Sequence, residues 1–437
     1  MKNDDKSTVN LNEEPAVKLS RPMLIFSVAT VYCMFIWNVT IRFGANTLYP
    51  LIQEDWALTD AQVGLLASAI SLGMALFVLP GSYIADKWSR TKMVTVLGSI
   101  FSLGSLLAGA AASFSFLLFT RFFSGIGFSA FAPAASTSLI TWFKRSIWGK
   151  VLGFYNTSQQ AGVLVGFMLI GALATKYGWQ GTFYILGAVA MVLVILSLFL
   201  PKQQGPKSSK NENQVSLKSA VPVLFKNKSL VGLAIFTGVA NAMTVAMLAF
   251  MPIYFVRILE MPLQQAATFT GLTIFVGVAS GPLAGTTLDF LVKKDRRARM
   301  WLGTIIFILG GLFYAWGFQQ GSIPLIMVGA FFTSWFPTIY HTGTQELVPD
   351  WYRAASYGFV VLGLQGIGVL GPMIAGSISD SVGVQTALVY VSLGYLICGL
   401  GYYLISFVYK NDYEIARAME ADSLTIGTKP AGESIGG

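Results

Sequence analysis

The sequence is poor in charge. Asp, Glu, Lys and Arg make up 11% of its 437 residues, whereas hydrophobic residues make up 54%. A soluble domain has about 25% charged residues, so the composition excludes an ordinary water-soluble protein and predicts a chain that folds in a lipid bilayer. The first apolar run is too long for the core of a signal peptide, and we therefore expect no cleaved leader.

Histidine and cysteine are also scarce, with one His and two Cys. Cys33 and Cys398 fall inside apolar runs, where small packed side chains are expected rather than a disulfide. We find no paired metal ligands, no nucleophile–histidine–acid set and no phosphate loop with lysine. Residues 366–371 match G-x-G-x-x-G, but they lie in an apolar helix without a preceding strand. Gly162-x-x-x-Gly166 is likewise interpreted as a motif of close helix packing. The sequence therefore predicts no enzyme, no metal site and no cofactor.

What the sequence has instead is a series of apolar runs of about 20 residues or more, the length at which a helix crosses a bilayer. Their period is never the alternation of a membrane barrel. The predicted fold is an all-α membrane protein with twelve transmembrane helices in two pseudo-symmetric six-helix bundles. The predicted spans are residues 23–52, 61–80, 94–112, 115–141, 150–175, 181–200, 229–256, 264–288, 300–318, 322–346, 355–377 and 384–408.

A polar, lysine-rich stretch divides these spans six and six. We expect it to be disordered or to carry a short surface helix, and we expect the segment after Lys410 to be a flexible tail. The predicted divisions are an N-terminal tail (1–22), a first bundle (23–200), a linker (201–228), a second bundle (229–409) and a C-terminal tail (410–437).

The net charge of +9 raises the question of a nucleic-acid partner, but the distribution of charge has a simpler cause. All but four of the 29 lysines and arginines lie in the termini, the linker and the even-to-odd loops. The exceptions are Arg42, Arg121, Lys176 and Arg257. This asymmetry follows the positive-inside rule and predicts that both termini are cytoplasmic. We expect membrane lipids as surroundings, no nucleic acid, a bacterial inner membrane and a monomer.

A charged motif follows the second span of each half. Ser82 and Asp86 lie 203 positions before Gly285 and Asp289, and such a repeat is typical of a duplicated transporter. The first copy resembles the G-x-x-x-D-[RK]-x-G-[RK]-x-[RK] signature of the major facilitator superfamily, although serine replaces glycine twice. RFFSGIG, which begins at Arg121, resembles the fourth-span signature of that superfamily.

The resemblance implies that the paired motif latches the two halves on the cytoplasmic side and opens when the carrier turns inward. A carboxylate near a helix N-terminus is stabilised by the helix dipole, and nearby arginines can pair with it. Plain positive-inside charge is the alternative, which explains Lys87 and Lys92 but not Asp86. The residues of this predicted latch are Ser82, Asp86, Lys87, Arg90, Gly285 and Asp289.

Within the superfamily, the segment Ile41–Gly64 resembles the first span of the anion:cation symporter family, which carries sugar acids and other organic anions. The shared elements are Arg42, the QED of residues 53–55 and LTDAQVG. TQELVPDWYRAASYG and GVLGPMIAGSISDSVG resemble both that family and the spinster family. The choice between these subfamilies stays open.

Two arginines lie inside the predicted spans. The only acidic residue inside these spans is Glu346, at the end of span 10. A charge within the membrane costs at least ~2.5 kcal/mol, so it needs a wet cavity or a partner. Arg42 and Arg121 are expected at similar depth, on spans that line the central cavity in this superfamily. We therefore predict that a substrate anion neutralises them, because a guanidinium binds carboxylate, sulfonate or phosphate through two hydrogen bonds. Snorkelling to the interface and bonding to backbone carbonyls remain alternatives.

The usual proton sites of this family are missing. Proton-coupled relatives carry an acid before the first-span arginine and after the G-x-G of span 4, whereas this chain has Ile41 and Phe128. Exchange, facilitated diffusion or another coupling ion is favoured, and His341 and Glu346 remain possible coupling residues. Span 7 has Val245 at the position that corresponds to Arg42, which favours a monoanion or small dianion over a phosphate ester.

Several polar side chains within spans could orient a ligand, although the same residue types also hold helices together. The complete set of predicted substrate-binding residues is Arg42, Arg121, Asn46, Tyr49, Asn156, Gln159, Gln160, Asn241, Trp335, Tyr340 and Gln365.

The sequence thus predicts a secondary transporter that moves a small organic anion, a carboxylate or sulfonate, by alternating access. Two alternatives stay open. One is a spinster-like exporter of lipids, amphiphiles or drugs, with an apolar cavity and no need for Arg42. The other is a non-transporting sensor with a carrier fold, which the duplicated latch disfavours.

Overall fold

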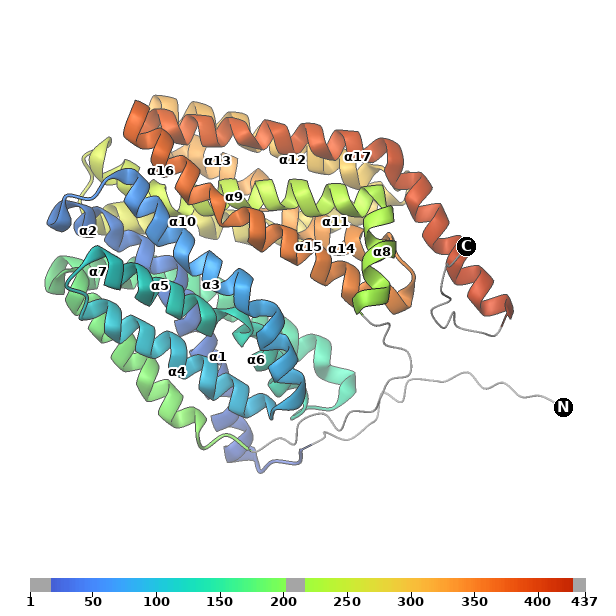
Figure 1. Cartoon of the computed structure of the whole chain (residues 1–437), viewed down its shortest axis with the longest axis horizontal. Coiled ribbons are helices and arrows are strands. Elements are labelled where there is room, and N and C mark those ends of the chain that lie inside the picture. Colours follow the sequence, from blue (N-terminus) through green and yellow to red (C-terminus); the bar gives the residue numbers. More distant parts are fainter. Residues whose placement is uncertain (1–16, 202–216, 427–437) are drawn as a thin grey trace.

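The computed structural model describes residues 17–201 and 217–426, and the described residues form helices and short connections without strands (Figure 1). The first six-helix bundle begins with a span made of four pieces, and its remaining spans are longer helices. Its helical elements are α1 (Arg21–Val39), η1 (Thr40–Gly44), η2 (Ala45–Leu48), α2 (Tyr49–Trp56), α3 (Asp60–Lys87), α4 (Arg90–Gly109), α5 (Phe114–Ser129), α6 (Phe131–Ile140), η3 (Arg145–Ile147) and α7 (Trp148–Ser197).

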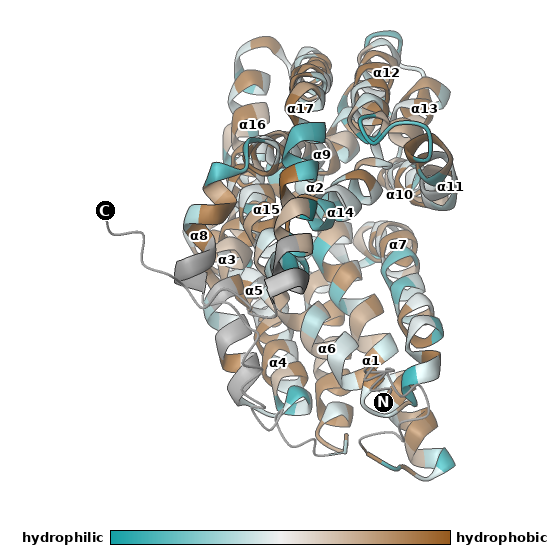
Figure 2. Cartoon of the chain, turned by 90° about the vertical axis from the view of Figure 1, so that its right-hand side faces the viewer, coloured by the Kyte–Doolittle hydropathy of each residue, from teal (hydrophilic) through white to brown (hydrophobic). Residues whose placement is uncertain are grey.

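The second bundle follows a short amphipathic helix, α8 (Leu217–Lys226), which packs on α9 and α15. Its elements are α9 (Lys228–Arg257), α10 (Leu263–Ala279), α11 (Gly281–Val292), α12 (Ala298–Gln320), α13 (Ile323–Thr333), α14 (Phe336–Glu346), η4 (Asp350–Tyr352), α15 (Arg353–Gly368), α16 (Leu370–Val382) and α17 (Val384–Ile426). Figure 2 shows that most of the helical surface is apolar and that hydrophilic residues gather toward helix ends and loops.

The described part of the chain contains eleven helical segments that are long and apolar enough to cross a membrane. One of them, Arg145–Ser197, has 53 residues, about 80 Å of helix, which is far more than one bilayer crossing needs. Gly178 inside it has φ 66° and ψ −179°, so the chain turns there between two helices. This segment contains the two predicted spans 150–175 and 181–200, and the twelve-span prediction is confirmed.

Two ends of the molecule need names. The terminal face carries the start of α1 at Arg21, helix α8 and the end of α17, and the distal face is the opposite end, where α2, α9 and α16 end (Figure 1). The two bundles pack on each other along α3 and α16 and along α7 and α10. Hydrogen bonds that join them lie toward the distal face, from Ser68 Oγ to the Val369 carbonyl (2.6 Å) and from Gln264 Nε2 to the Met168 carbonyl (3.3 Å).

Glycine makes the distal contact close. A Cβ on Gly64 would lie 2.2 Å from the carbonyl oxygen of Pro372, and a Cβ on Gly376 would lie 2.3 Å from that of Asp60. Only glycine lets two backbones approach this closely. Toward the terminal face, a Cβ on Gly285 would meet nothing within 4 Å. The bundles are therefore closed on each other at the distal face.

The segment after Lys410 was expected to be a flexible tail, and for residues 411–426 this is wrong, because α17 continues to Ile426. Polar contacts hold the extension against the terminal face. Asp412 accepts a hydrogen bond from the Ser229 backbone N–H at the start of α9 (2.8 Å). Glu420 accepts one from the backbone N–H of Asp350 (2.9 Å), and the Tyr413 ring packs against the guanidinium of Arg296.

Candidate functional site

The first span is irregular where it carries Arg42. Residues Thr40–Gly44 form a π-helical turn, and the following four residues form a 3₁₀ turn before α2 begins. Such local changes of helix pitch inside a span often mark functional sites. The Arg42 guanidinium lies 4.8 Å from the centroid of the Phe43 ring.

Helix α7 packs against the π-helical turn and holds it in place. The Thr40 hydroxyl donates to the Gly162 carbonyl (3.0 Å), and a Cβ on Gly44 would lie 2.7 Å from the backbone of Gly166. Gly162 and Gly166 form a small-xxx-small pair, which allows close helix packing in membranes. The sequence interpretation of Gly162-x-x-x-Gly166 as a packing motif is confirmed, and this packing supports the turn that carries Arg42.

Arg42 is half-buried and makes no hydrogen bond or ion pair with any residue that the structure describes. Asn46, one turn further along, is already engaged, because its Nδ2 donates to the Leu248 carbonyl of the second bundle (3.1 Å). Arg42 therefore lies near the junction of the two bundles with its hydrogen-bonding capacity unused.

Arg121 lies in a different environment. Its side chain is 1% exposed, and none of its three nitrogens has a hydrogen-bond partner. The guanidinium lies 5.4 Å from the Phe183 ring centroid and within electrostatic reach of the Tyr49 hydroxyl, which is itself buried without a hydrogen bond. Neither snorkelling nor bonding to backbone carbonyls describes Arg121. A buried guanidinium without a hydrogen bond is costly.

Arg42 lies on span 1, whereas Arg121 lies on α5 and reaches span 1 at a different level. Arg121 faces Tyr49, which lies seven residues beyond Arg42, or about 10 Å along a helix. The Arg121 partner on span 1 is thus nearer the distal face than Arg42. Sequence analysis placed the two arginines at similar depth. That prediction does not include the difference of about 10 Å along span 1, because it was made from helix midpoints and not from side-chain contacts.

The two positions where the family resemblance predicts acids in proton-coupled members are packed in the protein core. Ile41 is fully buried, and Phe128 is buried with its ring 5.4 Å from that of Phe101. Within the described residues, no carboxylate pairs with Arg42 or Arg121.

Tyr340 is buried and packs on the rings of Phe336 and His341, and the other predicted binding residues fall into two groups. Asn241 Nδ2 donates to the Leu364 carbonyl (2.9 Å), and Trp335 Nε1 donates to Ser280 Oγ (2.8 Å), so these two, like Asn46, already join helices. The remaining amide side chains make no hydrogen bond with the described part of the chain and are exposed or half-buried. They are Asn156, Gln159, Gln160 and Gln365.

The two candidate coupling residues lie on α14 in contrasting surroundings. The ring of His341 stacks on Tyr340 (4.4 Å between centroids) and on Tyr357 of α15 (5.0 Å). Glu346, at the end of the helix, is bound by Arg299 (2.9 Å) and Arg296 (3.5 Å). Two arginines therefore hold Glu346, whereas His341 lies between two tyrosine rings.

Of the predicted latch, the structure describes the side chains of only Arg90 and Asp289, together with the backbone of Gly285. Asp289 is exposed and makes no hydrogen bond or ion pair with any described residue, and Arg90 Nη1 donates to the Thr137 carbonyl (3.3 Å). The side chains of Ser82, Asp86 and Lys87 lie outside the described residues. The expected position near a helix N-terminus is wrong for Asp289, which lies in the last turn of α11, because that helix extends beyond the predicted end of the span.

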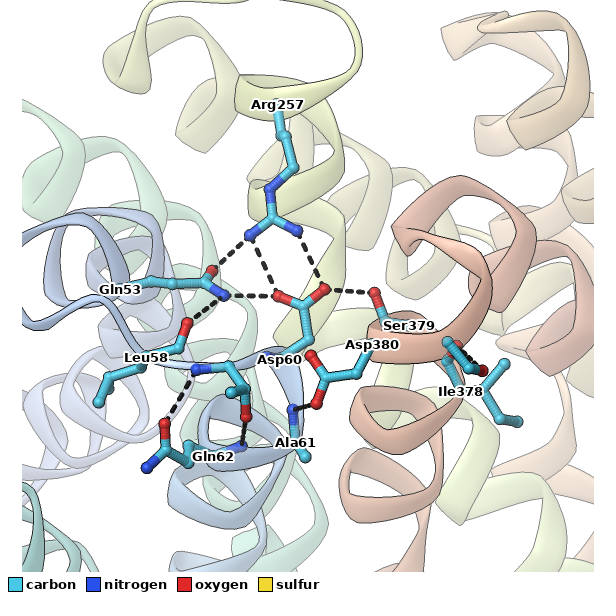
Figure 3. Close-up of polar contacts among 11 residues, drawn as sticks. Gln53, Leu58, Asp60, Ala61, Gln62, Arg257, Ile378, Ser379 and Asp380 are labelled. Atoms are coloured by element: carbon cyan, nitrogen blue, oxygen red, sulfur yellow. Dashed lines mark hydrogen bonds and ion pairs between the residues drawn. The ribbon is translucent and has the colours of Figure 1, made fainter.

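One charged group was missed by the sequence interpretation. We name it the distal cluster, and it joins the two bundles at the distal face (Figure 3). Its members are Gln53, Asp60, Arg257, Ser379 and Asp380. The available signal was Arg257, one of only two basic residues in the odd-to-even loops, together with the acids that flank the spans.

Comparison with known proteins places this geometry in a family. A model of the Major Facilitator Superfamily matches residues 28–334. The chain is 26% identical to a probable sulfoacetate transporter of Cupriavidus necator, over 64% of this chain and 68% of that protein. It is 23% identical to a probable galactarate/D-glucarate transporter of Bacillus subtilis, over 93% and 95%. It is 24% identical to a cis,cis-muconate transport protein of Acinetobacter baylyi, over 80% and 86%.

Solved structures support the same fold. The crystal structure of a bacterial homolog of the human lysosomal transporter Spinster, inward-facing and unoccupied, matches with a TM-score of 0.82 and 17% identity, covering 90% of this chain and 99% of that one. A nucleoside transporter structure matches with a TM-score of 0.70 and 16% identity, covering 89% and 99%. With its two six-helix bundles and this family match, the chain belongs to the major facilitator superfamily of transporters and not to a family of enzymes.

Proposed function

We propose that this transporter moves a small organic anion, a carboxylate or a sulfonate, across the membrane by alternating access. The observation that carries the proposal is Arg121, a buried guanidinium without a hydrogen bond or a carboxylate partner among the described residues. Arg42, half-buried and equally unpaired, supplies the accessible charge. A bound anion satisfies donors that otherwise remain desolvated.

The relatives support the substrate class. Sulfoacetate, galactarate, glucarate and muconate all carry carboxylate or sulfonate groups, which fit the planar fork of arginine. The low identities leave the individual substrate open, and each of the four anions named for these relatives carries two acidic groups. Asn156, Gln159 and Gln365 are the side chains with unused polar groups that we assign to orienting it.

We infer that the terminal face is cytoplasmic, because the lysines and arginines outside the spans gather there. The protein is then a carrier of a bacterial inner membrane, and the conformation described here, closed at the distal face, is the one that faces the cytoplasm. The substrate is released there before the bundles rock to the opposite state.

We propose exchange or facilitated diffusion as the mode of transport. Ile41 and Phe128 stand in the packed core where proton-coupled relatives carry acids, and two arginines hold Glu346. Coupling to a proton through His341 is the alternative, since its ring lies half-buried between two tyrosines. A proton gradient across liposomes separates the two, because only coupled transport is driven by it.

The test is uptake into liposomes with purified protein, screened by counterflow against carboxylates, sulfonates and phosphates. Arg42→Ala and Arg42→Lys are expected to abolish counterflow while the protein remains monodisperse, because a lysine cannot replace the two-point contact of arginine. Arg21→Gln, at the start of the same span, is the matched control and should transport normally. Normal kinetics in Arg42→Ala would overturn the anion proposal.

An amphiphile is the second candidate, favoured by an apolar cavity of about 470 Å³ between α1 and the start of α7. Its lining includes Leu24, Val28, Tyr32 and Phe154. An amphiphile carrier would keep transport in Arg42→Gln and lose it when Val28→Trp fills the cavity. The anion carrier is expected to give the opposite pair of results.

A further inference from the structure

The distal cluster crosses from one bundle to the other through a carboxylate. Arg257, the last residue of α9, donates from Nη1 to Asp60 Oδ2 (2.9 Å) and from Nη2 to Asp60 Oδ1 (3.1 Å), so the contact is bidentate. Ser379 of α16 donates to the same carboxylate. Within the first bundle, Gln53 donates to Asp60 (2.6 Å) and accepts from Arg257 (2.7 Å).

A second carboxylate closes the cluster from the opposite side. Asp380 of α16 accepts the backbone N–H groups of Asp60 (2.7 Å) and Ala61 (3.0 Å), the first two residues of α3. The first N–H groups of a helix have no partner within the helix, and a carboxylate beside them is favoured by the dipole. The N-terminus of α3 in the first bundle is thus capped by a residue of the second bundle.

The distal cluster is buried at its central carboxylate and exposed to solvent at the Arg257 side chain. The Asp60 side chain is 5% exposed, whereas that of Arg257 is 42% exposed. Directly below, the Gly376 position touches the Asp60 backbone, so the cluster fits only when the two helices are in full contact. A small outward movement of either bundle breaks the bidentate contact and the cap together.

The geometry points to a charge-paired gate: Asp60, Arg257 and Asp380 hold the distal face closed, and the distal face opens only when these pairs separate. This inference does not rest on the substrate. It assigns a role in the conformational cycle to three charged residues outside the arginine site, and it makes Arg257 and Asp60 a functional pair although they are 197 positions apart in the sequence.

Ser68 provides a reporter for the test. It is 1% exposed and donates across the same contact to Val369, so a thiol at this position is hidden while the distal face is closed. The variant Ser68→Cys is made together with Cys33→Ser, because Cys33 is exposed and Cys398 is buried. The rate of reaction with a fluorescent maleimide is measured in lipid nanodiscs without substrate, so failure of the anion proposal does not affect it.

Arg257→Gln is expected to raise the labelling rate about tenfold, and Asp60→Asn by a similar factor, since each removes one partner of the same charge pair. The double variant should be no faster than either single variant, because the two side chains act together. Lys176→Gln removes a positive charge from another distal loop, where Lys176 packs on Tyr177, and should label at the parent rate.

Size-exclusion profiles and thermal unfolding check that each variant is folded. If Arg257→Gln does not fold, Asp380→Asn takes its place, because it removes the charge and one of the two acceptor oxygens that cap α3 while it keeps the other. Labelling of the single variants at the rate of Lys176→Gln, or effects of Asp60 and Arg257 that add in the double variant, would overturn the gate.

Discussion

At the distal face, Asp60 is held by Arg257, Gln53 and Ser379, whereas at the terminal face the exposed Asp289 has no partner among the described residues. Both are aspartates at a helix end where the two bundles of a carrier can meet. The family resemblance directs attention to Asp289 and its repeat, because their motif is recognisable. The structure directs it to Asp60, because the charges there are actually paired.

The difference shows how one conformation selects its contacts. An ion pair between bundles exists only in the state that brings both partners together, so a carrier closed at one face has paired charges there and solvated charges at the other. We propose that the distal cluster and the Asp289 motif form alternately in the transport cycle, so that the two faces behave in opposite ways.

The largest effect is expected from the glycines. Gly64→Val places side-chain atoms against the Pro372 carbonyl, only 2.2 Å from the Cβ position, and should raise labelling of the Ser68→Cys reporter about 100-fold, since overpacking costs up to ~3 kcal/mol. Gly285→Val, in open space at the terminal face, should leave labelling unchanged or lower it. Equal labelling in the two variants would break the comparison.

Glu346 gives the next largest effect, on stability. Glu346→Gln leaves Arg299, which is 4% exposed, without its charged partner, and should cost about 3 kcal/mol. The matched control is Arg353→Gln, which breaks an exposed pair with Asp350 worth less than ~1 kcal/mol. Thermal unfolding in detergent measures both, and a midpoint for Glu346→Gln as high as that of the control would contradict the assignment of Glu346 to structure.

A direct comparison of the two aspartates is expected to give a smaller difference. Asp60→Asn removes a charge that is paired in this conformation and should lower the unfolding midpoint by about 1 °C, the size expected for ~1 kcal/mol in a protein of this length. Asp289→Asn removes an unpaired charge and should leave the midpoint unchanged. A larger loss in Asp289→Asn would mean that its carboxylate is engaged in the closed distal state.

Salt should have the smallest effect. Arg257 is partly exposed, so ions can weaken its attraction to Asp60, and raising NaCl from 0.05 to 1 M should increase labelling of the Ser68→Cys reporter about twofold as the Debye length falls to ~3 Å. The reporter in the Arg257→Gln background should not respond. Equal salt responses in both backgrounds would show that the charge pair does not set the rate.

Some of this site could be predicted from single residues. Arg42 and Arg121 stood out because a charge in an apolar span needs a reason, and the Gly162–Gly166 spacing identified the packing that supports the Arg42 turn. The π-helical turn itself could not be predicted, because nothing in a five-residue sequence distinguishes it from a regular helix. The position of Arg121 beside Tyr49 and Phe183 depends on how three spans are rotated against each other.

By itself, the sequence determined the twelve spans, their division into two halves and the presence of uncompensated arginines, because length, hydropathy and charge are local properties that a bilayer selects directly. Only the tertiary structure decided which charges meet. Arg257 and Asp60 pair because α9 ends and α3 begins at the same face in a conformation closed there. That pairing depends on the relative position of two rigid bundles, which no run of residues specifies alone.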